Sequence, residues 1–296
     1  MEKELCNMEM RSIFGIEPNR KYLFSEKSFD PSRSPFIKLR IKTIYIDKNI
    51  ENIITYIKEN KISYDDFKVS YIKSEDGDVS YEERLKATRD IGFVITGFPD
   101  IHNPKIELAI TKVNDKWVFG ELIKNDLKWH KHNDKPHSYS NAIPIRMGRA
   151  LVNIATADNR NIRLIDPCCG VGTIVIEALD LGINVKGYEI NKCIVFNARN
   201  NIEYFGYDRD IIISGDMHNI VESFDVAIVD IPYGLYSPVT LEEQMDIIKT
   251  SRKIASRVVI ITFENMDNII ISSGFKIIDK CYMKKGNMIR QISICE

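Results

Sequence analysis

The chain has 296 residues, of which 44% are hydrophobic and 28% are charged, so it can bury the core of one or two globular domains. Its formal net charge of -1 excludes a strong field that would by itself attract nucleic acid or an anionic membrane. Residues 1–4 do not resemble a signal peptide, no apolar run is long enough to span a bilayer, and the six cysteines show no disulfide framework. These features predict a cytoplasmic protein without a membrane association.

The first half of the chain predicts a small α+β domain over residues 1–121. Alternating apolar residues indicate strands, and isoleucines at helical spacing or charged runs indicate helices. The expected elements are a strand at 36–45, a helix at 50–60, a strand at 67–72, a helix at 81–91, and strands at 106–110 and 116–120. Residues 122–148, which contain Trp129 and three histidines, are expected to be a linker that folds against another part of the chain.

Residues 149–296 predict a doubly wound, mostly parallel sheet. Short apolar strands are expected at 162–166, 184–189, 211–214, 224–230 and 258–263, separated by helix-length segments. Two more strands, 275–281 and 288–295, flank a Gly286-Asn287 turn, which predicts an antiparallel hairpin that closes the sheet. Such an ending favours a methyltransferase that uses S-adenosylmethionine (SAM) over a dinucleotide-binding dehydrogenase.

A glycine loop after the first of these strands predicts a cofactor site. In Asp166-Pro-Cys-Cys-Gly-Val-Gly-Thr, Gly170 and Gly172 let the backbone approach a ligand, and the next helix aims free N–H groups at it. Asp166 would repel a pyrophosphate but could face the sulfonium or amino group of SAM; a strand-capping aspartate is the alternative. Cys168 and Thr173 of the same loop are expected to contact SAM as well.

Acidic residues at the ends of the next two strands complete the predicted SAM site. Glu189 lies where a doubly wound fold places the acceptor for ribose hydroxyls. Asp216 follows the third strand and could accept from the adenine amino group while Met217 packs on the ring; a solvated turn is the alternative for Asp216. No cysteine or acidic spacing supports a metal site.

The segment Asp230-Ile-Pro-Tyr at the end of the fourth strand indicates methyl transfer to an amine. An exocyclic amine needs two acceptors for its hydrogens, here the Asp230 carboxylate and a backbone carbonyl near Ile231 or Pro232. Pro232 restricts the backbone, and Tyr233 offers a flat face for stacking a base or amide. We predict Asp230, Pro232 and Tyr233 as the catalytic residues, acting by position and electrostatics without a covalent intermediate or metal.

These motifs resemble those of a known family. Asp230-Ile-Pro-Tyr-Gly is similar to the (Asp/Asn)-Pro-Pro-Tyr motif of amino-methyltransferases, and residues 166–173 resemble the THUMP-containing tRNA guanine 2-amino methyltransferases. Residues 129–139 and 146–155 resemble that family's linker and the helix before its cofactor loop, and residues 98–104 followed by 116–120 resemble the end of a THUMP domain. Ile231 departs from the motif, which usually has proline there.

The resemblance implies a Rossmann-like SAM-dependent methyltransferase domain at 149–296, preceded by a ferredoxin-like or THUMP-like RNA-binding domain. The implied reaction is methylation of the exocyclic 2-amino group of guanosine in tRNA, at or near position 10, with RNA as the partner. Ribosomal RNA, DNA adenine or cytosine and protein glutamine stay open as substrates, as does a non-catalytic SAM- or RNA-binding module. A protein partner or a homo-oligomer is also left open.

Overall fold

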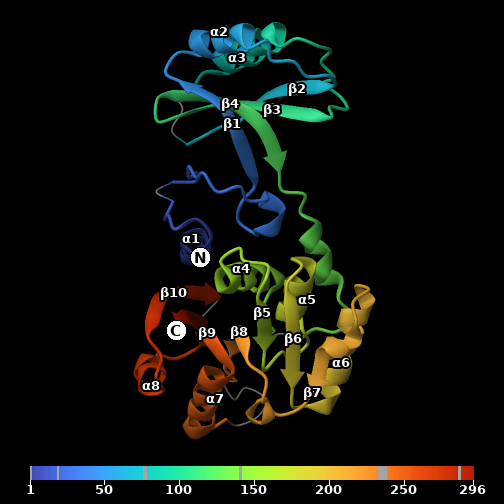
Figure 1. The fold of residues 1–296 in the computed structure, drawn as a ribbon, viewed down its shortest axis with the longest axis vertical. Coiled ribbons are helices and arrows are strands. Elements are labelled where there is room, and N and C mark those ends of the chain that lie inside the picture. Colours follow the sequence, from blue (N-terminus) through green and yellow to red (C-terminus); the bar gives the residue numbers. More distant parts are fainter. Residues whose placement is uncertain (1, 19, 76–78, 140–141, 233–238, 286–287) are drawn as a thin grey trace. The chain divides into compact units, whose positions relative to one another are not determined.

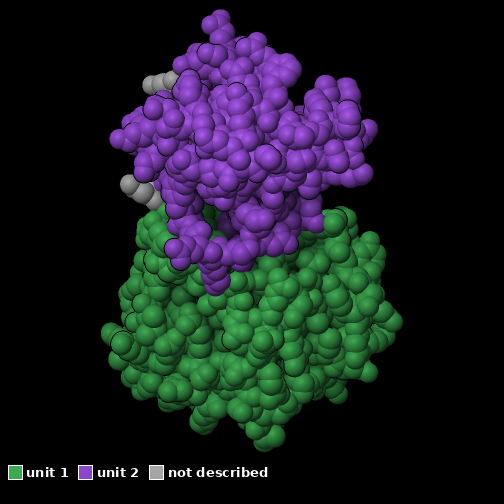
Figure 2. All heavy atoms as spheres, turned by 45° about the horizontal axis from the view of Figure 1, so that its top comes forward, with its two compact units in different colours: residues 1–18, 33–36, 127–296 green, residues 19–32, 37–126 purple. Residues whose placement is uncertain are grey.

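The chain leaves its first structural unit after residue 18 and returns to it at residues 33–36 and again at residue 127. Unit 1 contains residues 1–18, 33–36 and 127–296, and unit 2 contains residues 19–32 and 37–126 (Figure 2). The structure is a computed structural model that describes residues 2–18, 20–75, 79–139, 142–232, 239–285 and 288–296. Each unit has a hydrophobic core of its own and is described separately.

Unit 2 is a mixed sheet with two helices packed on it. Its strands are β1 (Leu39–Asp47), β2 (Phe67–Tyr71), β3 (Ile106–Val113) and β4 (Lys116–Lys124), in the order β1-β4-β3-β2. Strands β2 and β3 are parallel, and the other neighbours are antiparallel. Helices α2 (Ile50–Glu59) and α3 (Tyr81–Val94) pack on the sheet through Ile53, Ile57, Ala87 and Ile91 (Figure 1). The expected α+β element order is therefore confirmed.

Unit 1 is built on a larger, mostly parallel sheet. Its strands are β5 (Arg163–Asp166), β6 (Asn184–Glu189), β7 (Ile212–Ser214), β8 (Phe224–Asp230), β9 (Ala255–Thr262), β10 (Ile277–Lys285) and β11 (Met288–Cys295). They lie in the order β10-β11-β9-β8-β5-β6-β7, and β11 is antiparallel to both of its neighbours. The predicted parallel sheet with a closing antiparallel hairpin is confirmed, while the Gly286-Asn287 turn lies outside the described residues.

Helices cover both faces of this sheet because its strands are apolar on both sides. The helices are α1 (Lys3–Phe14), α4 (Ile145–Thr156), α5 (Thr173–Asp180), α6 (Lys192–Tyr204), α7 (Leu241–Ile254) and α8 (Asp267–Ser272) (Figure 1). The first four pack with Leu164 of β5 in one core, and the last two pack with the next residue, Ile165, in the other. Short 3-10 turns occur at η1 (Pro31–Arg33), η2 (Lys128–Asp134), η3 (Arg209–Ile211) and η4 (Met217–Asn219). None of the helices in the described ranges is long and apolar enough to cross a membrane.

The strand order reverses between β5 and β8. From β5 the sheet continues through β6 and β7 in one direction, and from β8 it continues through β9 in the other. Ligands of doubly wound proteins bind at the carboxyl ends of the strands beside such a switch point. Asp166 ends β5 and Asp230 ends β8, so the topology brings these two predicted residues to the same edge.

The N-terminal segment lies in a different unit from the one that the sequence indicated. Residues 1–121 were expected to form one domain, but α1 packs against α4 and β10 of unit 1. Leu5 and Met8 of α1 are buried in the same core as Leu151 of α4, and the resulting apolar contact holds the first helix there. The C-terminal boundary of this domain was expected at residue 121, but β4 continues to Lys124 and unit 2 continues to residue 126.

A buried carboxyl group joins three segments of unit 1. Glu9 on α1 is fully buried; its Oε2 accepts a hydrogen bond from Ser34 Oγ at 2.6 Å, and its Oε1 accepts one from Asn153 Nδ2 at 2.7 Å. Burial raises the pKa of Glu9 from 4.5 to about 7, although the two hydrogen bonds lower it in part. The folded protein therefore favours the protonated form of this group.

We expect Glu9→Gln to reduce the loss of stability between mildly acidic and neutral pH. Above pH 4.5 the unfolded chain releases the Glu9 proton while the folded chain keeps it up to about pH 7. The free energy of unfolding of the wild type should fall by about 3 kcal/mol over this window, since one pKa unit corresponds to about 1.4 kcal/mol. Urea unfolding followed by Trp129 fluorescence in a Trp117→Phe background reports unit 1 alone.

The same measurement on Glu17→Gln, which removes an exposed carboxylate near α1, is the matched control. If the free energy of unfolding of Glu9→Gln falls between pH 4.5 and pH 8 as much as that of the wild type, burial does not raise the pKa of Glu9 as expected.

Candidate active site

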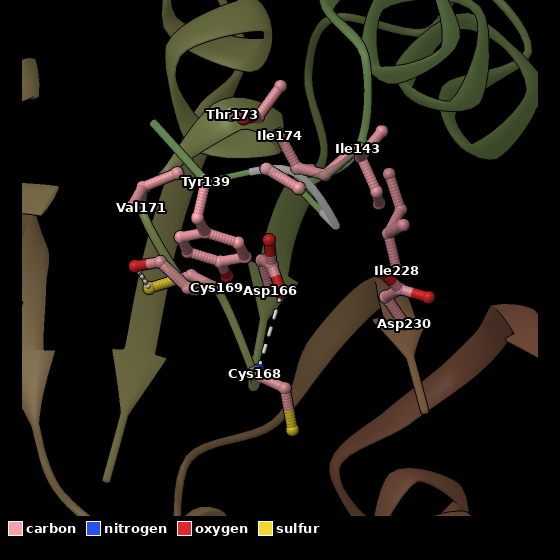
Figure 3. Close-up of a pocket in the computed structure, with 12 residues that line it drawn as sticks. Tyr139, Ile143, Asp166, Cys168, Cys169, Val171, Thr173, Ile174, Ile228 and Asp230 are labelled. Carbon is pink, nitrogen blue, oxygen red and sulfur yellow. Dashed lines mark hydrogen bonds between the residues drawn. The ribbon is translucent and has the colours of Figure 1, made fainter. Parts of the chain in front are cut away.

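A pocket opens at the switch point, at the carboxyl edge of the parallel strands. Its lining comes from the loop after β5, the end of β8, the start of α5 and the segment before α4 (Figure 3). The lining residues are Tyr139, Ala142, Ile143, Asp166, Cys168, Cys169, Gly170, Val171, Thr173, Ile174, Ile228 and Asp230. Five predicted site residues thus share one pocket: Asp166, Cys168, Gly170, Thr173 and Asp230.

The glycine loop turns through backbone conformations that favour glycine. Gly170 has φ +52° and Gly172 has φ +82°, and Gly172 is the N-cap of α5. The N–H of Cys169 donates to the carbonyl of Tyr188 on β6 at 2.8 Å, so the loop is tied to the neighbouring strand. The loop therefore presents backbone to the pocket, although Gly172 itself does not line it.

Glu189 holds the loop from the end of β6. Its Oε2 accepts from the N–H of Gly170 at 3.1 Å, and its Oε1 accepts from the N–H of Asn191 at 2.9 Å. The carboxylate is half-buried and does not line the pocket, but its contact with Gly170 places it directly beside the lining. The structure thus places Glu189 at the end of β6, where its carboxylate supports the glycine loop; its contact with ribose stays a prediction.

Asp166 is the most deeply buried acid of the site. Its side chain is 4% exposed, and its Oδ1 accepts from the N–H of Cys168 at 3.3 Å (Figure 3). Burial raises the pKa of Asp166 well above its usual range, and the nearby carboxylates of Asp230 and Glu189 raise it further. A positive ligand charge in this pocket would favour the ionised form of Asp166, so the cluster is suited to a cation.

The predicted adenine-side residues lie at the margin of the pocket. Met217 is buried, and its Sδ lies 3.8 Å from Sγ of the lining residue Cys168. Asp216 is half-buried and caps η4, because its Oδ1 accepts from the N–H of His218 at 2.9 Å. Met217 therefore reaches the site through Cys168, whereas one oxygen of Asp216 is engaged in holding the turn.

Asp230 carries an acceptor atom that the fold leaves unused. Among the described residues, its Oδ1 is buried without a hydrogen-bond partner. Burial raises the pKa of Asp230 from 3.8 to about 6, and the guanidinium charge of Arg290 on β11 lowers it in part. A buried acceptor without a partner costs free energy unless a ligand supplies a donor.

The residues after Asp230 are held by the neighbouring strand and helix. The N–H of Ile231 donates to the carbonyl of Ile261 at 3.0 Å, and Nε2 of Gln244 on α7 donates to the carbonyl of Pro232 at 2.8 Å. Tyr233, predicted to stack a base, lies outside the described residues.

Tyr139 is a pocket residue that the sequence reasoning placed only in a linker. Its ring enters the site beside Asp166 (Figure 3), and a Cβ on Gly170 would collide with its hydroxyl oxygen. Burial and the nearby carboxylates Glu189 and Asp230 raise the pKa of its hydroxyl, which stays protonated. Tyr139 is the last residue of the segment 129–139, which resembles the family's linker, and this resemblance was the only hint of a role for it. No spacing in the sequence indicated where the segment would fold.

A single asparagine holds the Tyr139 segment against the glycine loop. Asn201 on α6 is fully buried; its Oδ1 accepts from the N–H of His137 at 2.8 Å, and its Nδ2 donates to the carbonyls of His137 and Val171, each at 2.9 Å. The side chain of Asn201 therefore binds the backbone of both the linker and the cofactor loop. The sequence did not indicate these contacts.

The three linker histidines make separate contacts. His132 Nδ1 lies 2.6 Å from Glu177 Oε1 in a buried cluster with Arg149, His130 lies against Trp129 with ring centroids 3.9 Å apart, and His137 meets Asn201 through its backbone. Within the described parts of the chain, no group of three or more histidine, cysteine or acidic side chains could hold a metal ion.

The site fits SAM by its donors and charges. Asp166 would face the sulfonium or amino group, Glu189 would accept from the ribose hydroxyls, and the positive-φ loop exposes backbone. The buried Thr173 Oγ1 at the start of α5 has no partner among the described residues, which leaves a hydroxyl for the ligand. These residues would hold SAM, whose methyl donor is the sulfonium centre.

Two family models and two curated tRNA methyltransferases match parts of this chain. A family model described as RMKL-like, methyltransferase domain matches residues 134–267, and one described as DNA methylase matches residues 7–199. A tRNA (guanine(10)-N2)-dimethyltransferase of Methanothermobacter thermautotrophicus is 28% identical over 50% of this chain and 46% of its own length. One of Pyrococcus abyssi is 28% identical over 52% of this chain and 49% of its own length. The chain thus spans about half the length of these curated relatives.

Among solved structures, TrmN from Thermus thermophilus is similar with a TM-score of 0.46 and 15% identity, covering 88% of this chain and 84% of its own. The matched residues of both family models include the glycine loop and the end of β6, and the first of them also includes Asp230. The chain therefore belongs to the family described as DNA methylase, whose model matches more than half of it, and its residues 134–267 match the methyltransferase domain of the other model.

Proposed function

We propose that the protein transfers a methyl group from SAM to the exocyclic 2-amino group of guanosine in tRNA, which releases S-adenosylhomocysteine and one proton of the amine. The observation that carries the proposal is the buried Oδ1 of Asp230, which has no partner among the described residues and lines the same pocket as Asp166. An ionised carboxylate only accepts hydrogen bonds, so it selects a donor such as an amine. The choice of guanosine and tRNA is supported by the two relatives named tRNA (guanine(10)-N2)-dimethyltransferase.

The residues of the site would act by position and charge. Asp230 accepts from one amine hydrogen and a backbone carbonyl at residue 231 or 232 accepts from the other, which orients the nitrogen lone pair toward the methyl donor. Asp166 and Glu189 would hold the donor, and Tyr139 lines the pocket beside Gly170. Tyr233 is proposed to stack the base, and unit 2 is proposed to be the ferredoxin-like or THUMP-like domain that binds the RNA.

The first test is methyl transfer from labelled SAM to unmodified tRNA transcripts, with duplex DNA and a total protein extract assayed in parallel. Nucleoside mass spectrometry is expected to find guanosine methylated on its 2-amino nitrogen. A transcript with inosine at the target position is the matched control, because inosine lacks that amine. Label in DNA or protein alone, or equal label in the inosine transcript, would contradict the proposed substrate.

Methyl transfer is expected to fall as the pH falls below about 6. Asp230 must be ionised to accept from the amine, and its pKa is raised to about 6 in the free protein. A bound cation favours the ionised form, so the inflection of kcat/KM for RNA at saturating SAM should lie at or somewhat below this pH. Rates measured from pH 5 to 8 should decrease up to tenfold per pH unit on the acid side; a rate that rises toward pH 5 would contradict the role of Asp230.

A further inference from the structure

Two hydrogen bonds fix the backbone on either side of the Ile231 carbonyl. The N–H of Ile231 donates to the carbonyl of Ile261 at 3.0 Å and extends the pairing of β8 with β9 by one residue. Beyond it, Nε2 of Gln244 donates to the carbonyl of Pro232 at 2.8 Å. The first bond holds the peptide group before Ile231 and the second holds the peptide group after Pro232. The Ile231 carbonyl belongs to the peptide group between them.

Rotation of this central peptide group is restricted by its own residues as well. The ring of Pro232 fixes its φ near -65°. The side chain of Ile231 is 2% exposed and packs in the core under α7, so the residue cannot turn without losing buried apolar contact. A proline at position 231 would lack the N–H that now bonds to Ile261. Where the family motif usually has the ring of a proline, Ile231 is held instead by a hydrogen bond and by its buried side chain.

The donor of the second bond sits on a well-anchored helix. Helix α7 begins with a capping box: Oγ1 of Thr240 accepts from the N–H of Glu243 at 3.2 Å, and Oε2 of Glu243 accepts from the N–H of Thr240 at 2.7 Å. Ile247 and Ile248, three and four residues after Gln244, are buried against the sheet. The half-buried amide of Gln244 is thus presented from a fixed position.

We infer that Gln244 is a positioning residue, which together with the Ile231–Ile261 bond aims the Ile231 carbonyl as the second acceptor for the substrate amine. This inference rests on the proposed amine methyl transfer and names the carbonyl that the transfer uses. The Pro232 carbonyl already accepts from Gln244, so we assign the preceding carbonyl, next in the chain to Asp230, as the acceptor. Gln244 contacts neither SAM nor the methyl group in this role.

The test begins with Gln244→Leu, which keeps the size of the side chain and removes its donor. We expect kcat to fall about 10- to 100-fold because the acceptor is misplaced, while the Kd for SAM measured by calorimetry stays within twofold. Glu242→Gln, a change of an exposed side chain on the same helix, is the matched control and should leave both values unchanged. Equal losses of kcat and SAM affinity in Gln244→Leu would indicate a general structural role and overturn the inference.

Gln244→Glu gives a readout that a purely structural role would not move. A protonated glutamic acid can donate to the Pro232 carbonyl, whereas an ionised one repels it. The kcat of this variant, divided by that of the wild type at the same pH, should therefore rise as the pH is lowered from 8 to 5. A ratio that is constant with pH would overturn the inference.

Hydrogen exchange separates this inference from the proposed substrate. The Ile231 amide is expected to exchange faster in Gln244→Leu than in the wild type, whatever the enzyme methylates. If the wild type leaves tRNA unmodified and exchange is still accelerated, the proposed function fails and the positioning role stands. Unchanged exchange together with an unchanged kcat would overturn the role of Gln244.

Discussion

Asp230→Ala is expected to abolish methyl transfer while leaving SAM affinity nearly intact. The substitution removes the buried acceptor that the fold leaves without a partner among the described residues. Loss of one preorganised electrostatic contact to a reacting group typically lowers kcat by about 100- to 1000-fold. Single-turnover transfer from labelled SAM measures the chemical step, and calorimetry measures SAM binding.

Two further variants make the Asp230 result specific. Asp225→Ala changes the same residue type on the same strand, but its side chain is exposed and its Oδ2 accepts from the N–H of Arg163 at 2.7 Å, so transfer should be unaffected. Asp230→Asn keeps one acceptor oxygen and should retain intermediate activity. Asp230→Ala also removes a carboxyl group whose pKa is raised by burial, so unfolding should not become easier at pH 8. Equal loss of transfer and SAM affinity in Asp230→Ala would contradict its place on the substrate side.

Glu189→Ala is expected to show the opposite pattern, a loss of SAM binding. Its carboxylate is predicted to accept from the ribose hydroxyls, and its Oε2 also holds the N–H of Gly170 at 3.1 Å. A hydrogen bond to a charged group contributes about 1.5–3 kcal/mol, so loss of two such bonds should raise the Kd for SAM at least about 100-fold. Isothermal titration with SAM measures this effect directly.

The control variants test whether the lost charge or the lost loop contact is responsible. Glu189→Gln keeps an oxygen for the Gly170 N–H and should lose less affinity than the alanine variant. Glu203→Ala removes an exposed carboxylate from the following helix and should bind SAM as the wild type does. A Kd for Glu189→Ala within threefold of the wild-type value would remove Glu189 from the SAM site.

Local patterns predicted most elements of the fold because each strand and helix has a periodicity of its own. The apolar strands at 162–166, 184–189 and 224–230 lie within a residue of β5, β6 and β8. Helix α1 was missed although Leu5, Met8 and Ile13 are buried on it, because those residues alternate with charged ones at a chain end that carried no other signal. Its assignment to unit 1 depends on contacts with residues more than 130 positions away.

Apart from Pro232, which is held by Gln244, the predicted site residues that the structure describes fall into two groups. Asp166, Cys168, Gly170, Thr173 and Asp230 line one pocket, because parallel strands bring their carboxyl ends to the same edge. Glu189, Gly172 and Met217 border it through one contact or through the loop itself, and Asp216 caps a turn beside it. The roles given to these residues are predictions, and the Asp230 and Glu189 variants test two of them.

The sequence by itself determined which residue types end each strand: an acidic, glycine-rich loop after β5 and, at the end of β8, a carboxylate that we propose accepts from the substrate amine. Only the tertiary structure decided which backbone groups are held and by what. Tyr139 enters the pocket because Asn201, 64 residues beyond His137, binds the linker backbone. Gln244 reaches the Pro232 carbonyl from a helix that starts beyond the motif. Such contacts join residues with no periodic or spacing relation in the chain, so they follow from packing and hydrogen-bond satisfaction across elements rather than from any local pattern.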